Sequence, residues 1–331
     1  MDSRVYAAVL LSAALVLGWA SPASSQLGHF TVTADPRSNH TGFGNTLQAA
    51  NSLAGGAGRF HVTVGDLDGR VWDNRAVIDS DFGAGATWYP VIGNHEKEDG
   101  IEMEWLRAEY DSGNGVRTSL YDLTNHDGPV GTQRTTYSWD DPLTNTHYIA
   151  LNEYWNGGVN EGAGASTSGS DTAADGDVVP QLYNWLAADL AANRGKAVFV
   201  FGHEPAYPYS WQRHYGDSLD AHPANRDAFW ALLEAEEVEA YFCGHTHQYA
   251  IRQPTGQVWQ IDTGAAGNGE YETFVDVVLL IGQVRYDVYN NASGSWSLLE
   301  SWTEDANVIP EPATLTLLAA AGLVALKRRR R

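Results

Sequence analysis

The stretch FCGHTHQYAI, residues 242–251, decides the fold of this 331-residue chain. The apolar run Val238–Cys243 indicates a β-strand, which ends at Gly244. Two histidines follow, His245 and His247, with one residue between them. In α/β folds, binding and catalytic sites gather at the carboxyl ends of strands. The stretch therefore predicts a β-sheet whose binding or catalytic residues lie at one edge.

The same pattern, an apolar strand that enters a tight polar turn, occurs four more times upstream. We expect these strands within His29–Arg37, Arg59–Gly69, Ala86–Glu96 and Lys196–Pro205. Glycines at the turns let the backbone bend sharply and come close to a site. The polar residues of the five turns are Asp35, Asp66, Asn94, His95, Glu96, His203, His245 and His247.

Helices and further strands complete the expected α/β architecture. Val178–Asn193 is amphipathic with leucines on one face, and Asn225–Glu237 is a second predicted helix. Thr146–Tyr154 is an expected strand, and Gln257–Leu299 alternates strands and turns. Alternating strands and helices predict a layered fold.

The polar turn residues have the composition of a metal site. Carboxylate, amide oxygen and imidazole suit Mn, Zn or Fe ions. The set is too large for one ion, whereas two divalent or trivalent ions bridged by a shared carboxylate fit it. Such pairs clamp an in-line displacement at phosphorus.

In this order the turns resemble the calcineurin-like metallophosphoesterase superfamily, whose pattern is D-x-H, G-D, G-N-H-[D/E], G-H and G-H-x-H. Here the corresponding stretches are ADPR, GDLD, GNHE, GHEP and GHTH, from Asp35 to His247. The resemblance implies a four-layer α/β/β/α sandwich of two mixed β-sheets flanked by helices. It also implies hydrolysis of phosphate mono- or diesters, with a metal-bound hydroxide as the nucleophile.

The resemblance assigns a role to each matching residue. Asp66 would bridge the two ions, and Asp35 and His247 would hold the first. The second ion would be held by Asn94, His203 and His245. His95 would donate a proton or stabilise the transition state, with Glu96 orienting it.

The chain departs from the family pattern at Arg37, where the family has a metal-binding histidine. A guanidinium cannot ligate a cation. The purple acid phosphatase branch lacks that histidine and uses a tyrosine three residues after the G-D aspartate, but that position is Gly69 here. Three alternatives follow: water completes the first ion's shell, His40 substitutes as a ligand, or the first ion binds weakly and leaves a one-metal or inactive site. Arg37 has two alternative roles, a fork that donates to phosphate oxygens or a salt bridge to Asp68 or Glu96.

Both ends of the chain have the patterns of targeting segments. Residues 1–25 have an apolar run followed by small residues, which predicts a secretory signal peptide. Residues 310–331 contain Pro-Glu-Pro, a short apolar stretch and five basic residues, which predicts a membrane-inserting helix with a positive-inside stop. This order resembles the PEP-CTERM sorting tail of Gram-negative bacteria, which is recognised by an exosortase. Residues 27–305 are left as the metallophosphoesterase domain.

These ends predict an exported protein of the cell envelope or extracellular matrix, held transiently at the inner membrane by its C-terminal helix. The expected partners are a small phosphoester substrate and the exosortase. The formal net charge of −21 argues against a stable nucleic-acid partner, because such a surface repels polyanions. A single cysteine, Cys243, excludes an internal disulfide and is expected to be a buried thiol.

A second hypothesis comes from a different functional class. Arg37 and the sorting tail are together compatible with a catalytically impaired surface or matrix protein that keeps the metallophosphoesterase scaffold. Retention of His95 beside Asn94 favours the enzyme, because a structural site would not need a proton donor there.

Overall fold

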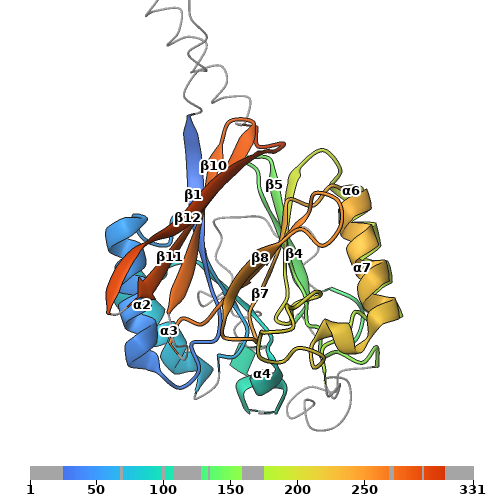
Figure 1. Ribbon diagram of the computed structural model, residues 1–331, viewed down its shortest axis with the longest axis horizontal. Coiled ribbons are helices and arrows are strands. Elements are labelled where there is room, and N and C mark those ends of the chain that lie inside the picture. The colour runs from blue at the N-terminus through green and yellow to red at the C-terminus, as the bar shows by residue number, and fades with distance from the viewer. Residues whose placement is uncertain are drawn as a thin grey trace, which may run out of the picture.

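Two six-stranded mixed sheets pack face to face with helices on their outer faces (Figure 1). The computed structural model describes residues 25–309 apart from 68–69, 99–100, 104, 107–127, 133–134, 159–174, 268–271 and 293. The expected four-layer α/β/β/α sandwich is confirmed.

The first sheet carries three of the predicted strand-to-turn units. β1, β2 and β3 run parallel, and the remaining neighbours pair antiparallel. In order across the sheet, the strands are β12 (Ser295–Asp305), β11 (Gln283–Ala292), β10 (Thr273–Leu280), β1 (Gln26–Thr33), β2 (His61–Val64) and β3 (Trp88–Val91).

The second sheet carries the other two units, at β6 and β7. Four of its strands, β5, β6, β7 and β9, are parallel, and the two edge strands are antiparallel to them. The order is β4 (Tyr137–Asp141), β5 (Thr146–Ala150), β6 (Ala197–Phe201), β7 (Ala240–Cys243), β9 (Trp259–Thr263) and β8 (Tyr249–Arg252).

Aromatic side chains from both sheets fill the space between them. Phe30 of β1 stacks on Phe60 with ring centroids 4.9 Å apart, and it forms a T-shaped pair with Phe199 of β6 with centroids 5.3 Å apart. Tyr89 of β3 stacks on Trp139 of β4 at 3.9 Å. Large buried rings contribute most of the apolar area removed from water, so these contacts fix how one sheet lies on the other.

Each outer face is covered by its own pair of helices. α2 (His40–Leu53) and α3 (Val71–Phe82) flank the first sheet, and α6 (Pro180–Ala192) and α7 (Pro223–Ala235) flank the second (Figure 1). The predicted apolar face of α6 is confirmed, since Leu182, Leu186 and Leu190 are buried. Cys243 is a buried thiol in the same cluster. Two short helices, α4 (Asn94–Glu98) and η2 (Leu219–Ala221), complete the described elements.

The two ends of the described chain leave the domain at the edge away from the carboxyl ends of the parallel strands. Gln26 opens β1 opposite Leu280. Ile309 donates its N–H to the Thr144 carbonyl at 3.1 Å, just before β5 begins. Among the residues that the structure describes, no helix is long and apolar enough to cross a membrane. Residues 1–24 of the predicted signal peptide and the whole predicted sorting tail lie outside those residues.

A buried histidine far from the polar turns makes stability depend on pH. His147 in β5 has Nδ1 2.7 Å from Asp140 Oδ1 and Nε2 2.8 Å from Asp189 Oδ2. Burial lowers the pKa of His147, but hydrogen bonds to the two carboxylates outweigh burial and raise the pKa above 6.5. A raised histidine pKa stabilises the fold fully below the unfolded value, and this stabilisation is lost as the pH rises through the folded pKa.

We therefore expect the free energy of unfolding to fall as the pH rises above about 7, and to fall less steeply in His147→Gln. Urea unfolding at a series of pH values measures both slopes. Parallel slopes for the two proteins would show that His147 is not the group responsible.

Candidate metal centre

Five turns at the carboxyl ends of parallel strands form the site. They follow β1, β2, β3, β6 and β7, as the sequence predicted. Several site residues have backbone conformations in the left-handed region, with φ of 49° at Asp35, 55° at Asp66, 68° at His245 and 58° at His247. Strained non-glycine residues of this kind are typical of functional sites, where the surrounding structure holds them.

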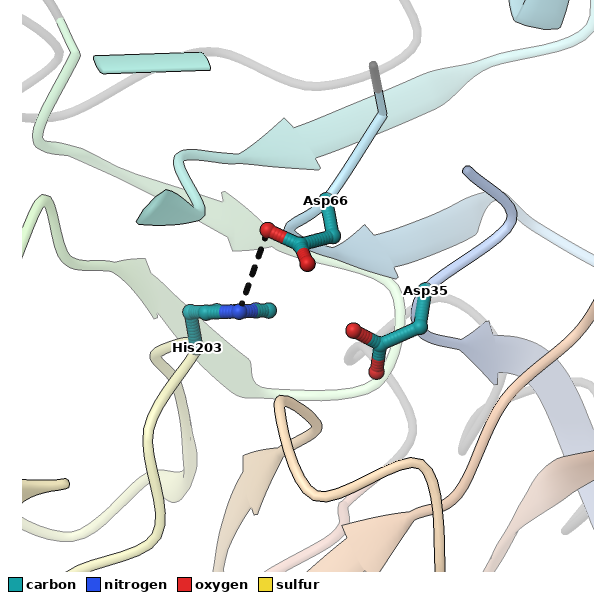
Figure 2. A group of neighbouring side chains, drawn as sticks. All are labelled: Asp35, Asp66 and His203. Atoms are coloured by element: carbon teal, nitrogen blue, oxygen red, sulfur yellow. Dashed lines mark ion pairs between the residues drawn. The ribbon is translucent and has the colours of Figure 1, made fainter. Parts of the chain in front are cut away.

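Asp35, Asp66 and His203 form the centre of the site (Figure 2). One potential ligand atom from each lies within 4.8 Å of the other two, and all three residues are buried. Asp66 Oδ1 is 3.3 Å from His203 Nε2, and Figure 2 shows the second Asp66 oxygen turned toward Asp35.

The hydrogen bonds of His203 set which ring nitrogen can accept. Nδ1 is 2.7 Å from the Val64 carbonyl, which can only accept, so Nδ1 carries the proton. Nε2 lies 3.3 Å from Asp66 Oδ1 and has no hydrogen-bond partner in the described part of the chain. A cation between Nε2 and the carboxylate, either a proton or a metal ion, satisfies both atoms.

His245 lies next to this group, and Asn94 is the predicted ligand in the turn after β3. Asn94 Oδ1 is buried, and no described residue donates to it. The His245 ring lies 5.1 Å from the His203 ring, and its Nε2 donates to the Asp217 carbonyl at 3.2 Å. Burial, together with the neighbouring histidines, lowers the pKa of His245 to about 2, so the ring is neutral as a ligand must be.

Asp35 and His247 form a second group on the other side of Asp66. His247 Nε2 lies 3.4 Å from Asp35 Oδ1. The other Asp35 oxygen, Oδ2, accepts the His245 backbone N–H at 3.0 Å, which ties the turn after β1 to the turn after β7.

The pKa values of the two central carboxyl groups are shifted in opposite directions. It raises the pKa of Asp35 well above its usual range, and the Asp66 charge adds to this shift. Burial also opposes ionisation of Asp66, but His203, His95 and Arg37 outweigh it and lower the pKa of Asp66. A cation bound between two carboxylates this close reduces the repulsion between their negative charges.

The donor set fits metal ions. The facing pairs Asp66 Oδ1–His203 Nε2 and Asp35 Oδ1–His247 Nε2 are 3.3 and 3.4 Å apart. Two adjacent ligands about 2.1 Å from one ion lie roughly 3 Å apart. The residues therefore form two candidate ligand sets that meet at Asp66.

Arg37 lies inside the site. Its NH1 donates to Asp66 Oδ2 at 3.2 Å and to His95 Nε2 at 2.6 Å. Asp66 is a partner that the sequence did not suggest. Asp68 and Gly69 lie outside the described residues. His40, the suggested substitute ligand, opens α2, and its Nε2 is buried without a hydrogen bond to any described residue.

The Glu96 carboxylate accepts backbone N–H groups of the neighbouring turns. Oε2 bonds to Gly93 at 2.7 Å and Asp66 at 3.0 Å, and Oε1 bonds to Leu67 at 2.6 Å. Glu96 therefore holds the turns that carry Asp66 and His95 together.

Sequence reasoning missed buried carboxyl groups behind the ligands. Glu153, just after β5, accepts the backbone N–H groups of His203 and Glu204 at 2.8 Å each. Burial raises the pKa of Glu153 to about 7. Asp262 at the end of β9 accepts from Thr246 Oγ1 at 2.6 Å. Glu153 lies near the carboxyl end of the predicted strand Thr146–Tyr154, which was the available indication.

Comparisons with known proteins agree with this geometry. The family model described as calcineurin-like phosphoesterase matches residues 28–249, and the PEP-CTERM protein-sorting motif matches residues 308–331. An acid phosphatase of Aspergillus ficuum is 36% identical over 91 residues, which are 27% of this chain and 14% of that protein. The chain thus spans a small part of this curated relative.

Solved structures show the same fold at low identity. A dimetal phosphatase from Danio rerio is 14% identical with a TM-score of 0.60, over 85% of this chain and 100% of that one. The purple acid phosphatase PPD1 of yellow lupin is 14% identical with a TM-score of 0.52, over 84% and 53%. GAP50, described as the anchor in the inner membrane complex of Plasmodium, is 13% identical with a TM-score of 0.52, over 88% and 94%.

The family model covers most of the chain and includes all five turns that meet at Asp66. This chain belongs to the calcineurin-like phosphoesterase family.

Proposed function

We propose that this protein is an exported, metal-dependent phosphoesterase that hydrolyses phosphate mono- or diesters at a dinuclear site. One observation carries the proposal: the buried His203 Nε2 faces Asp66 Oδ1 at 3.3 Å, and neither Nε2 nor the buried Asn94 Oδ1 has a hydrogen-bond partner among the described residues. Buried polar atoms are rarely left in this state unless something binds them.

In this proposal each of the two candidate ligand sets holds one ion. Asp66 is shared, Asp35 and His247 belong to the first set, and the second is Asn94, His203 and His245. Ions held there would place positive charge against the phosphoryl oxygens and lower the pKa of a water nucleophile.

His95 and Arg37 face the reacting group. The Arg37 guanidinium only donates, so His95 Nε2 is the acceptor of their 2.6 Å hydrogen bond. A bound phosphate that draws the guanidinium to its own oxygens frees Nε2 to take up a proton and pass it to the leaving oxygen. Glu96 is a positioning residue in this scheme.

The alternative is a catalytically impaired surface or extracellular-matrix protein. The contact of Arg37 with both Asp66 and His95 favours it, because the guanidinium lies among groups needed for catalysis.

Hydrolysis assays separate the two functions. We expect residues 25–309 to hydrolyse a chromogenic monoester or diester with Mn²⁺, Zn²⁺ or Fe²⁺ present, and to lose the activity with a chelator. Asn94→Ala and His95→Ala should each lower kcat by about 10²-fold or more, from loss of a metal ligand and of proton transfer. A folded, metal-loaded protein that cleaves neither ester would favour the impaired scaffold.

The sorting motif supports export to the cell envelope. We propose an exosortase-type enzyme as the partner of residues 310–331, in the envelope or extracellular matrix of a Gram-negative bacterium, with transient inner-membrane anchoring before processing.

A further inference from the structure

The position of Arg37 points to unequal ion binding by the two ligand sets. We infer that the set of Asn94, His203, His245 and Asp66 holds one ion tightly, while Arg37 supplies positive charge beside Asp35 and His247 and weakens the other ion. This inference rests on the metal-binding part of the proposed function.

The backbone keeps Arg37 in place. Its N–H donates to the Asp66 carbonyl at 3.0 Å, and the Asp35 N–H donates to the Gly65 carbonyl at 3.2 Å. The turn after β1 is therefore hydrogen-bonded along the turn after β2. Arg37 itself has φ of 50°, and its side chain is 22% exposed, so the guanidinium is held largely inside the site.

The guanidinium contacts the Asp66 oxygen that a second ion would need. Oδ1 of Asp66 faces His203, whereas Oδ2 accepts from Arg37 NH1 at 3.2 Å. Figure 2 shows that this second oxygen is turned toward Asp35. Arg37 thus interacts with Asp66 on the side of the Asp35–His247 set.

Charge balance favours a single tight ion. With a cation bound, both Asp35 and Asp66 are ionised and provide two negative charges, and Arg37 already offsets one of them. One divalent ion then leaves a net positive site, which suits a phosphate ester, whereas two ions would add strong repulsion with the guanidinium. The set around His203 offers three neutral ligands besides Asp66. It is therefore expected to bind its ion more tightly than the Asp35–His247 set does.

Metal stoichiometry tests the inference without reference to turnover. The full chain is stripped with a chelator and titrated with Mn²⁺, and bound ions are counted by equilibrium dialysis with elemental analysis. We expect one tightly bound ion per chain and a second ion that binds at least about 100-fold more weakly. At one equivalent of Mn²⁺, the electron paramagnetic resonance spectrum should be that of isolated Mn²⁺. Arg37→His removes the charge and adds an imidazole, so it should bind two ions tightly and show exchange-coupled Mn²⁺.

Two further variants separate charge from ligation. Arg37→Lys keeps the charge and should still bind one ion tightly. Arg37→Gln removes the charge without adding an imidazole, and it should raise the affinity for the second ion by a smaller factor than Arg37→His. If Arg37→His does not fold, Arg37→Gln still tests the effect of the charge.

The outcomes are distinct. Two equally tight ions in the unmodified chain would overturn the inference and leave the phosphoesterase proposal standing. No bound ion would overturn both. One ion in every variant would show that Arg37 does not control the second set.

Discussion

Asp66→Asn is expected to lower kcat for phosphoester hydrolysis by about 10³-fold or more. The change keeps the shape of the side chain but removes the charge at the point where both ligand sets meet. Its carboxylate lies 3.3 Å from His203 and 3.2 Å from Arg37, so both sets lose their shared ligand. Metal ions stabilise a phosphoryl transition state by several kcal/mol, and each 1.4 kcal/mol is a factor of ten.

The same variant should lose the rise in melting temperature that metal gives the unmodified protein, because an ion that binds only the folded state stabilises it by mass action. Asp73→Asn is a matched control, since Asp73 lies in the first turn of α3 and pairs with the exposed Arg70. Differential scanning calorimetry with and without Mn²⁺ measures the shift. A full metal shift in Asp66→Asn would remove Asp66 from the ligand set.

Gly65→Ala is expected to destabilise the fold by about 3 kcal/mol or more and to weaken metal binding. Gly65 has φ of 87°, and a Cβ there would lie 2.2 Å from His203 Nδ1. The backbone conformation costs roughly 1–2 kcal/mol for a residue with a side chain, and overpacking adds roughly 1–3 kcal/mol. The His203 ring cannot move aside without losing its hydrogen bond to Val64.

Gly55→Ala separates the two costs. Gly55 has a similar φ of 89°, but a Cβ there meets nothing within 4 Å. We expect this control to pay only the backbone cost and to keep its metal affinity. Urea unfolding and Mn²⁺ titration of the two variants make the comparison. Equal losses in both would mean that the His203 contact has no energetic weight.

The polar turns were predictable because the information is local. An apolar run, a glycine and a polar residue can be recognised in a few letters, and parallel strands bring such turns to one edge. This reasoning gave the turns after β6 and β7 as well as those after β1, β2 and β3. The division of the strands into two facing sheets came from the family resemblance, because strand order depends on contacts between distant segments.

The less predictable part of the site depends on side-chain direction. The contacts of Arg37 with Asp66 and His95 follow from left-handed backbone conformations at residues 35, 37 and 66. A short sequence pattern does not predict such conformations for non-glycine residues. Glu153 and Asp262 lie outside the family motifs and act through buried hydrogen bonds to neighbouring turns. α3 was also missed, because its apolar positions are irregular.

The route of the chain ends bears on how a copy tethered as proposed would be oriented. Gln26 and Ile309 both leave beside the amino ends of the parallel strands, while Asp66 and its neighbours occupy the other end of the sandwich. A molecule held through the residues beyond Ile309, as proposed above, would have its candidate metal centre at the end of the sandwich far from the attachment.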